Sequence, residues 1–265
     1  MTEEDFFCRL RRIIIITGHY GSGKTEFAVS LAMHAGALSV GEKSTGSVSV
    51  ISTGTESTES VSVVKDKNNN ITSLALIDLD IVNPYFRSRE RRDMLENAGI
   101  SVYGSVYEEE ITVELPALGA SLRAPLEADG CRVIVDTGGN DAGAMILNQF
   151  TKYFTDDETT VLAVINANRP DTSDAESALE HISAIEKTTG LTVSGIVNNT
   201  HLLRETTAGD ITKGHAICTR VCELTGKPLL CNCYPEGLIN PDELKGLSEY
   251  LMPLGLYMRP TWLDK

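Results

Sequence analysis

The segment Gly18-His19-Tyr20-Gly21-Ser22-Gly23-Lys24-Thr25 fits the pattern G-x-x-x-x-G-K-[ST] at every fixed position. An aliphatic stretch, Ile13–Ile16, precedes it, and residues with helical apolar spacing follow it. In such a loop, successive backbone N–H groups point inward at phosphate oxygens, and the start of the following helix adds its positive dipole end. The sequence therefore predicts a strand, a phosphate-binding loop and a helix in succession.

We expect six residues of this segment to contact a bound nucleotide, namely Gly21, Ser22, Gly23, Lys24, Thr25 and Glu26. The ammonium group of Lys24 is a cation for the β- and γ-phosphates, and we expect it to act in catalysis as well. The hydroxyl group of Thr25 is a ligand suited to Mg²⁺.

Carboxylates follow two further aliphatic runs. Residues Leu76-Ile77-Asp78-Leu79-Asp80 place two carboxylates on one face of a strand, because side chains two apart share a face. We expect Asp78 to belong to the magnesium shell and Asp80 to orient the attacking water. The alternative is that one of the two only caps the turn at Asn83 and Pro84.

The run Cys131-Arg132-Val133-Ile134-Val135-Asp136-Thr137-Gly138-Gly139 has the form of a Walker B strand. We expect Asp136 to hold magnesium, and Gly139 or Gly138 to offer an N–H to the γ-phosphate. A simpler interpretation is that Asp136 caps the strand before a turn.

Short β-branched runs alternate with helix-like stretches through the chain, which predicts an α/β fold. We expect the three-layer P-loop NTPase fold, with a mostly parallel twisted sheet of about seven strands and helices on both faces. The expected strands are Ile13–Thr17, Leu74–Leu79, Ser101–Tyr103, Arg132–Asp136, Val161–Asn166, Val193–Asn198 and Leu229–Cys233. The expected helices are Lys24–Ala35, Arg87–Ala98, Pro116–Ala128, Ala142–Tyr153, Ser173–Thr188, Thr206–Leu224 and Pro241–Leu251.

One segment interrupts this alternation. Between Gly41 and Val63, 14 of 23 residues are Ser, Thr or Gly. We therefore expect residues 1–265 to form a single nucleotide-binding domain that carries a flexible insertion at 38–72. The alternating residues Val48–Val50 and Val61–Val63 leave a small surface hairpin open as an alternative.

Composition excludes some classes of protein. A net charge of −14 and a pI near 4.8 argue against broad nucleic-acid binding, which needs a basic face. The aliphatic run Ile13–Ile16 is far shorter than the roughly 20 residues of a membrane span, and the acidic start is unlike a secretory signal. The end, Leu254–Lys265, offers no apolar helical face as a membrane anchor. We therefore expect a cytoplasmic protein.

Taken together, these motifs resemble those of the MinD/ParA family of P-loop ATPases, in the nitrogenase-iron-protein-like group. The segments Gly18–Glu26 and Asp78–Arg87 look like a bacterial branch known as the CobQ/CobB/MinD/ParA nucleotide-binding domain. The resemblance implies that Asn198, in the run Gly195–Asn199, and Pro235, in Tyr234-Pro235-Glu236, contact the adenine base. That family also carries a signature lysine that reaches across a dimer. His19 stands in its place here, so a homodimer is only one possible state.

The resemblance implies a hydrolase that binds ATP and Mg²⁺ and acts as a nucleotide-controlled switch on a protein partner. One alternative is an ATP-dependent ligase or kinase of the dethiobiotin-synthetase and cobyric-acid type. Another is a GTPase, because Asn168-Arg169-Pro170-Asp171 is a near match to the guanine-reading N-K-x-D. A module that binds nucleotide without hydrolysing it is a further alternative.

The cysteines leave two interpretations open. Cys218 and Cys222 would share a helical face, and Cys231 and Cys233 a strand face. Their spacings differ from common metal-binding knuckles, so buried apolar packing is the expected role.

Overall fold

The computed structural model describes residues 1–41, 71–80, 91–104, 116–139 and 141–258. Its strands form one eight-stranded sheet in the order β3-β2-β4-β1-β5-β6-β7-β8, in which every neighbouring pair is parallel. The strands are β1 (Ile13–Gly18), β2 (Ser73–Asp78), β3 (Ile100–Gly104), β4 (Cys131–Asp136), β5 (Thr159–Ile165), β6 (Gly195–Asn198), β7 (Leu229–Pro235) and β8 (Tyr250–Leu254).

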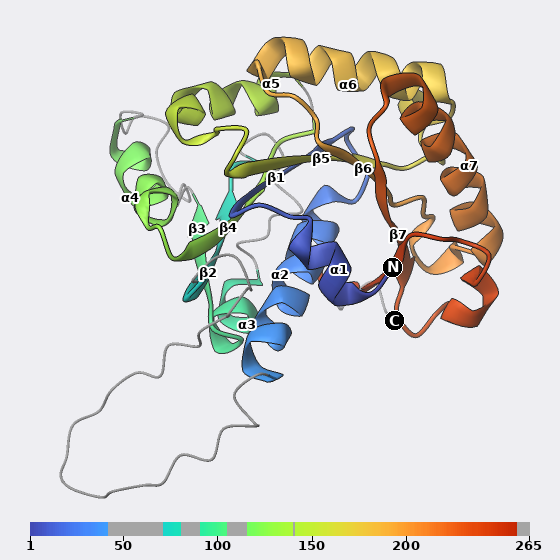
Figure 1. The fold of residues 1–265 in the computed structure, drawn as a ribbon, viewed down its shortest axis with the longest axis horizontal. Coiled ribbons are helices and arrows are strands. Elements are labelled where there is room, and N and C mark those ends of the chain that lie inside the picture. The colour runs from blue at the N-terminus through green and yellow to red at the C-terminus, as the bar shows by residue number, and fades with distance from the viewer. Residues whose placement is uncertain (42–70, 81–90, 105–115, 140, 259–265) are drawn as a thin grey trace, which may run out of the picture.

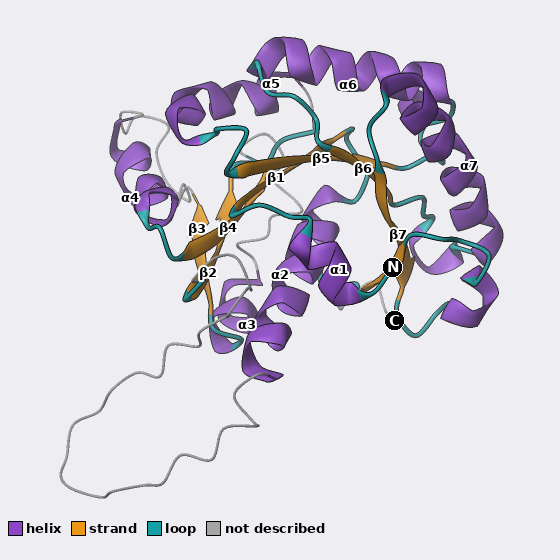
Figure 2. Cartoon of the chain, in the orientation of Figure 1, coloured by secondary structure: helices purple, strands orange, loops and turns teal. Residues whose placement is uncertain are grey.

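Helices cover both faces of this sheet (Figures 1 and 2). The α-helices are α1 (Glu3–Cys8), α2 (Lys24–Gly41), α3 (Arg92–Asn97), α4 (Pro116–Glu127), α5 (Asp141–Ala144), α6 (Ala175–Thr189) and α7 (Ala208–Thr225). Four 3₁₀ segments, η3 (Met145–Tyr153), η4 (Pro170–Thr172), η5 (Leu203–Glu205) and η6 (Pro241–Leu244), complete the described elements. Helices α1, α2 and α3 pack on one face, and α4, η3, α6 and α7 pack on the other.

The strands form where the sequence is continuously apolar. All six residues of β1 and all six of β4 are buried, as expected for parallel strands covered on both faces. Alternate residues of β1 enter different cores, with Ile14 and Ile16 on the α2 face and Ile13 and Ile15 on the α6 face. This packing fixes the register that brings the ends of β1, β2 and β4 together.

The end of the sheet departs from the expected pattern. The predicted helix Pro241–Leu251 is wrong, because only Pro241–Leu244 is helical and β8 follows as an eighth strand. Tyr250, Met252 and Leu254 are buried at alternate positions, which is the period of a strand, and β8 pairs with β7. Helix α1 was also not expected from the sequence. It begins with a capping box between Thr2 and Asp5.

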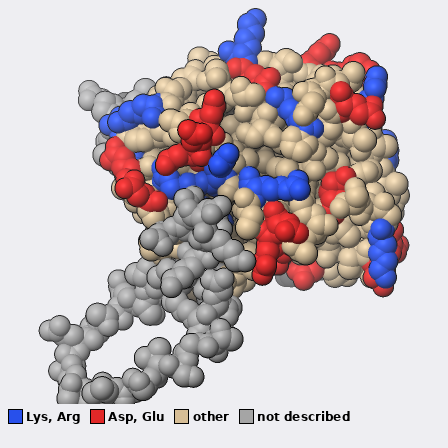
Figure 3. Space-filling model, in the orientation of Figure 1, with Lys and Arg blue, Asp and Glu red and all other residues tan. Residues whose placement is uncertain are grey.

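Two sequence expectations fall largely outside the described residues. Most of the 38–72 insertion lies at 42–70, although helix α2 extends through its first residues to Gly41. The first part of the predicted helix Arg87–Ala98 also lies outside, and the described part is α3. Within the described ranges, no helix combines the length and apolar character needed to cross a bilayer. On the face shown in Figure 3, basic and acidic side chains are interspersed.

Candidate nucleotide-binding site

The loop between β1 and α2 has the backbone form of a phosphate cradle. Gly21 and Gly23 have φ values of 77° and 78°, a region that residues with a Cβ adopt rarely. The N–H of Ser22 donates to the carbonyl of His19 at 3.1 Å, which closes the loop on itself. Helix α2 begins at Lys24, so its N-terminal dipole faces the interior of the loop.

Side chains from the ends of β5 and β6 hold this loop from below. The Asn166 amide donates to the carbonyl of Gly21 at 3.2 Å, and Arg169 Nε donates to the same oxygen at 3.1 Å. The amide of Asn199 donates to the carbonyl of Ser22 at 2.8 Å. These bonds use carbonyl groups of the loop, and its N–H groups other than that of Ser22 could serve a ligand.

A buried cluster of one ammonium group and several carboxylates lies beneath the loop. Lys24 is 6% exposed, and Asp136 is fully buried. Burial lowers the pKa of Lys24, whereas the charges of Asp136 and Asp80 act in the opposite direction. Burial, and after it the Asp78 carboxylate, raise the pKa of Asp136 to about 8, although Lys24 opposes this. The sheet register explains the cluster, because Asp78 and Asp136 are paired residues of β2 and β4.

The turn after β4 closes over Lys24. A Cβ atom at Gly139 would lie 2.8 Å from Lys24 Nζ and 2.9 Å from the backbone nitrogen of Tyr20, so only glycine fits there. A Cβ atom at Gly138 would lie 3.4 Å from a carboxylate oxygen of Asp80. The backbone N–H of Asp80 donates to Asp78 at 3.0 Å, which fixes Asp80 beside this turn. The structure thus brings Lys24, Asp80 and Gly139 together, and their roles toward a ligand stay predictions.

A cavity with a volume of about 260 Å³ adjoins this cluster. The predicted residues that line it are Gly21, Gly23, Lys24, Thr25, Glu26, Asp80 and Pro235. The predicted residues Ser22, Asp78, Asp136 and Gly139 are not among the lining residues. Residues from the later strands and the C-terminal part complete the lining: Tyr20, Arg169, Asn199, Thr200, His201, Leu203, Thr206, Cys233, Leu254, Leu256 and Met258. The cavity therefore extends from the carboxyl end of β2 to that of β8.

Glu26 borders the cavity, but protein backbone already occupies its carboxylate. Its two oxygens accept hydrogen bonds from the N–H groups of Tyr257 and Met258 at 2.6 and 2.9 Å. Burial raises the pKa of this carboxyl group, although the two N–H donors act in the opposite direction. Both carboxylate oxygens of Glu26 thus contact the C-terminal part of the chain, while the residue lines the cavity, and the ligand contact expected of it stays a prediction.

The structure does not bring Asn198 to the cavity. Its amide nitrogen donates to the carbonyl of Ile211 at 2.9 Å and to Asn232 Oδ1 at 2.8 Å, and its oxygen accepts from the Thr200 hydroxyl at 2.8 Å. These hydrogen bonds hold the fully buried side chain of Asn198 where β6 packs against β7 and α7. The next residue, Asn199, borders the cavity instead.

Several residues that line the cavity were not predicted from the sequence. His201 is the most distinctive, because burial lowers its pKa to about 4, with Arg169 adding to the effect, so the ring is neutral near pH 7. Its Nδ1 accepts from the N–H of Leu203 at 3.4 Å, which leaves the proton on Nε2. That buried Nε2 has no hydrogen-bond partner among the described residues. No short sequence motif indicates that the loop around His201 borders a cavity. The nearby pair Asn198-Asn199 only indicated that polar side chains follow β6.

The near match to a guanine-reading motif does not face the cavity. The Asp171 carboxylate pairs with His19 Nε2 at 3.0 Å and is 65% exposed, and Asn168 donates to Asp210 at 3.0 Å. Only Arg169 of this segment borders the cavity. His19, which stands where the resemblance would place the signature lysine, thus pairs with Asp171 and is not among the lining residues of the cavity.

Four of the six cysteines, Cys131, Cys218, Cys231 and Cys233, are buried, whereas Cys222 is half-buried and Cys8 is exposed. All six are free, and burial raises the pKa values of Cys218 and Cys233 well above the usual range. Within the described ranges, no three His, Cys, Asp or Glu side chains gather as a metal site. Cys131, Cys218, Cys231 and Cys233 pack in the apolar cores.

The residues beneath the loop nevertheless suit a magnesium ion held partly by phosphate. No hydrogen bond of ordinary geometry from the described residues reaches either oxygen of Asp136, although Thr25 lies near enough to help lower its pKa. A buried carboxylate in this condition is costly unless a cation or a donor accompanies it. Mg²⁺ prefers such oxygen ligands, and it commonly takes one or two carboxylates together with phosphate oxygens and water. Thr25, Asp136 and Asp78 could supply these ligands.

Comparisons with known proteins give likeness of fold only. No family model matches the chain, and no curated protein matches it in sequence. Among solved structures, the cell division protein FtsY of Thermotoga maritima is 19% identical with a TM-score of 0.43, covering 82% of this chain and 60% of its own. The signal recognition particle receptor FtsY of Elizabethkingia anophelis, solved with GDP, is 14% identical with a TM-score of 0.42, covering 82% and 55%.

The chain thus spans about 60% of the length of the first of these proteins, and similarity at this level does not bear on the ligand. The fold itself rests on the chain's own geometry. A parallel sheet, a glycine-rich loop between β1 and α2, and acidic residues at the ends of β2 and β4 belong together in one architecture. The chain has the α/β fold of P-loop nucleoside triphosphatases.

Proposed function

We propose that this chain binds ATP with Mg²⁺, hydrolyses it, and uses the two nucleotide states as a switch on a protein partner. The observation that carries the proposal is the buried Lys24, which lies between the phosphate loop and the carboxylates Asp136 and Asp80 at the base of the cavity. An ammonium group buried in this position is the usual counter-charge for the β- and γ-phosphates.

Each residue of the cluster has a distinct part in this proposal. The backbone N–H groups of Gly21, Gly23, Lys24 and Thr25 would bind the phosphates. The Thr25 hydroxyl and the Asp136 carboxylate would hold the metal, with Asp78 beside them. Magnesium supplies neutralisation of charge on the phosphates. Asp80 accepts a hydrogen bond from the attacking water and orients it toward the γ-phosphate, while the Gly139 N–H donates to that phosphate. These parts position groups and stabilise charge, which is what phosphoryl transfer requires.

Adenine is the base that the lining of the cavity favours. Recognition of guanine by a P-loop protein commonly depends on a carboxylate that accepts from the ring N–H groups. Among the described residues, the two carboxylates at the cavity are Asp80, at the phosphate end, and Glu26, whose oxygens already accept from Tyr257 and Met258. Asp171 lies outside the lining and pairs with His19.

The switch follows from where Asp80 and Gly139 lie. Both follow strands and lie outside them, so contacts with a γ-phosphate can change their positions. Loss of that phosphate would release them. A partner that binds these turns would then distinguish the ATP state from the ADP state.

Titration calorimetry with Mg²⁺ and either ATP or GTP tests the binding step. We expect ATP to bind more tightly than GTP, and Lys24→Ala to abolish the binding of both. A clear preference for GTP would overturn the choice of adenine, and failure of both nucleotides to bind folded protein would overturn the proposal.

Turnover tests the role of Asp80. We expect Asp80→Ala to retain ATP affinity but to slow hydrolysis by about 10²-fold, the lower range for loss of a positioned acid or base. Unchanged hydrolysis would refute its role. Hydrolysis that depends strictly on an added small metabolite would instead support a ligase or kinase.

A further inference from the structure

The C-terminal segment, residues 253–258, forms one side of the nucleotide cavity. Its side chains Leu254, Leu256 and Met258 line the cavity, next to Cys233 and Pro235 at the end of β7. In the sheet order, β7 and β8 lie well beyond β1, which leads into the loop before Lys24, and β2, which leads to Asp80. The apolar lining is therefore on the side away from the phosphate end.

Helix α2 holds the backbone of this segment through side chains spaced four residues apart. Glu26 accepts from the N–H groups of Tyr257 and Met258, the hydroxyl of Ser30 accepts from the N–H of Gly255 at 3.3 Å, and His34 Nε2 donates to the carbonyl of Pro253 at 3.3 Å. Residues four apart lie on one face of a helix. One face of α2, the helix that begins at the phosphate loop, thus forms hydrogen bonds with the C-terminal segment.

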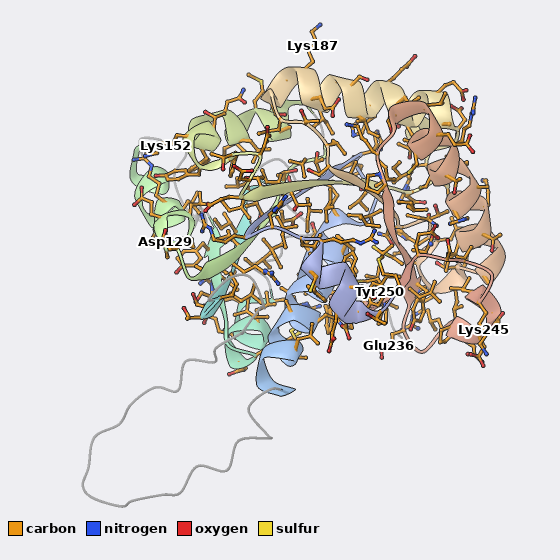
Figure 4. The ribbon with its side chains drawn as sticks, in the orientation of Figure 1. Asp129, Lys152, Lys187, Glu236, Lys245 and Tyr250 are labelled. Atoms are coloured by element: carbon orange, nitrogen blue, oxygen red, sulfur yellow. The ribbon has the colours of Figure 1, made fainter. Side chains whose placement is uncertain are left out.

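The segment is also anchored from the other direction. The N–H of Glu236, which follows β7, donates to the carbonyl of Leu254 at 2.9 Å. Figure 4 shows Glu236 and Tyr250 at the same end of the molecule. The segment is therefore fixed between α2 and the end of β7.

Leu256 adopts a backbone conformation that costs free energy. Its φ is 52°, in the left-handed region where leucine is rare. The hydrogen bonds to Gly255 and Tyr257 on either side hold it there. Residues whose strained backbone is held in place by neighbouring contacts are frequently found at sites that bind ligands. Here the presented side chain borders the cavity.

We propose that the C-terminal segment is the wall against which the purine base of the nucleotide packs, and that Glu26 is the positioning residue that holds it. The proposal deepens the proposed function and rests on it. A purine offers two flat apolar faces, and the side chains of Leu254, Leu256 and Met258 offer an apolar surface with no charge to satisfy. Glu26 follows Thr25 directly, so a single turn of helix connects the phosphate site to the base site.

The experiment compares two ligands that differ in the base. Mg²⁺–ATP and Mg²⁺–inorganic triphosphate are titrated into the unmodified chain and into Glu26→Gln, Leu256→Gly and Glu180→Gln. Glu180→Gln is the matched control, because it removes the same charge from an exposed position of α6. Leu256→Gly removes the side chain while relieving the left-handed strain, so it preserves the fold.

We expect Glu26→Gln and Leu256→Gly each to weaken ATP binding by about tenfold, equivalent to ~1.4 kcal/mol. Triphosphate affinity should stay within about twofold, since RT ln 2 is only ~0.4 kcal/mol. Glu180→Gln should change neither.

The outcomes separate the two proposals. If the unmodified chain binds neither ligand, the proposed function fails. The unmodified chain could bind ATP and triphosphate while each variant weakens the two ligands equally, or while neither variant changes ATP affinity. In either case only the proposal of the base wall is wrong. Circular dichroism and thermal melting of each variant confirm that the compared proteins are folded.

Discussion

Gly139 shows how closely the site is packed at the scale of one residue. It lies against the ammonium group of Lys24 and the backbone of Tyr20, so the turn after β4 and the phosphate loop touch without an intervening side chain. Backbone cannot move aside as a flexible side chain can. This close approach carries a direct consequence for catalysis.

We expect Gly139→Ala to lower kcat/KM for ATP by up to about 10²-fold, because displacement of a reacting group by about 1 Å has effects of this size. Steady-state kinetics would measure the change. Gly246→Ala is the matched control, since a Cβ atom there meets nothing within 4 Å. If both variants hydrolyse ATP equally well, the contact with Lys24 has no role in turnover.

His201 predicts a pH dependence of stability. Its pKa is about 4 in the folded chain, against an ordinary value of 6.5. The unfolded chain therefore takes up a proton more readily as pH falls below 6.5, and the stability present above 6.5 is lost progressively toward pH 4.

His201→Gln removes this titration and keeps a hydrogen-bond donor. Urea denaturation at pH 7.5 and pH 5 should show a smaller loss of unfolding free energy for His201→Gln than for the unmodified chain. Acidic residues titrate alike in both proteins, so the difference isolates His201. An equal loss in the two proteins would contradict the buried neutral ring.

At the scale of elements, the contact between β6 and α7 positions the loop that borders the cavity. Gly214 on α7 faces Asn198 and Thr200, and a Cβ atom there would overlap both side chains. Thr200 in turn accepts from the N–H of Ala167 at 3.1 Å, after β5. Helix α7 thus approaches closely enough to fix residues 198–201, and with them Asn199 and His201.

We expect Gly214→Ala to destabilise the chain by about 1–3 kcal/mol through overpacking, and to weaken ATP binding because Thr200 is displaced. Gly209→Ala, in the same helix, meets its nearest atom at an ordinary 3.5 Å and should stabilise the chain by about 0.4–1 kcal/mol. Urea denaturation and calorimetry would measure the two effects. If Gly214→Ala changed neither stability nor ATP affinity, the close approach of α7 to β6 would not be required for either property.

At the scale of the whole molecule, the first and last described elements meet. The ring of Phe6 on α1 stacks on that of Tyr250 on β8, with centroids 5.0 Å apart and planes at 25°. His34 on α2 bonds Glu3 at 2.9 Å as well as Pro253. The N-terminal helix therefore supports the edge strand that leads into the C-terminal segment.

We expect Phe6→Ala to lower the free energy of unfolding by about 3–5 kcal/mol, because this side chain is fully buried. Leu224→Ala on α7 is the control. Its side chain is 46% exposed, and its removal should change stability by no more than about 0.5 kcal/mol. A loss for Phe6→Ala no larger than for the control would mean that α1 is not part of the cooperative core. Urea denaturation provides the comparison.

The sequence by itself determined the parts that depend on neighbouring residues. The phosphate loop, the aliphatic strands β1, β2 and β4 and the acidic ends of β2 and β4 were predicted, because glycine conformation, apolar runs and side-chain alternation are local properties. Parallel pairing then brings Asp78 beside Asp136, as the predicted fold requires.

Only the tertiary structure decided which side chains reach the cavity. Asn198 and Asn199 are adjacent, yet the first is enclosed by α7 and β7 and the second borders the cavity, because side chains that are neighbours along an extended chain face opposite directions. The sequence separation between Glu26 and the N–H groups of Tyr257 and Met258 likewise hides their contact from any local pattern. Pairing with β7 likewise made a strand of Tyr250–Leu254, because long-range packing outweighs the weak local preference of so short a segment.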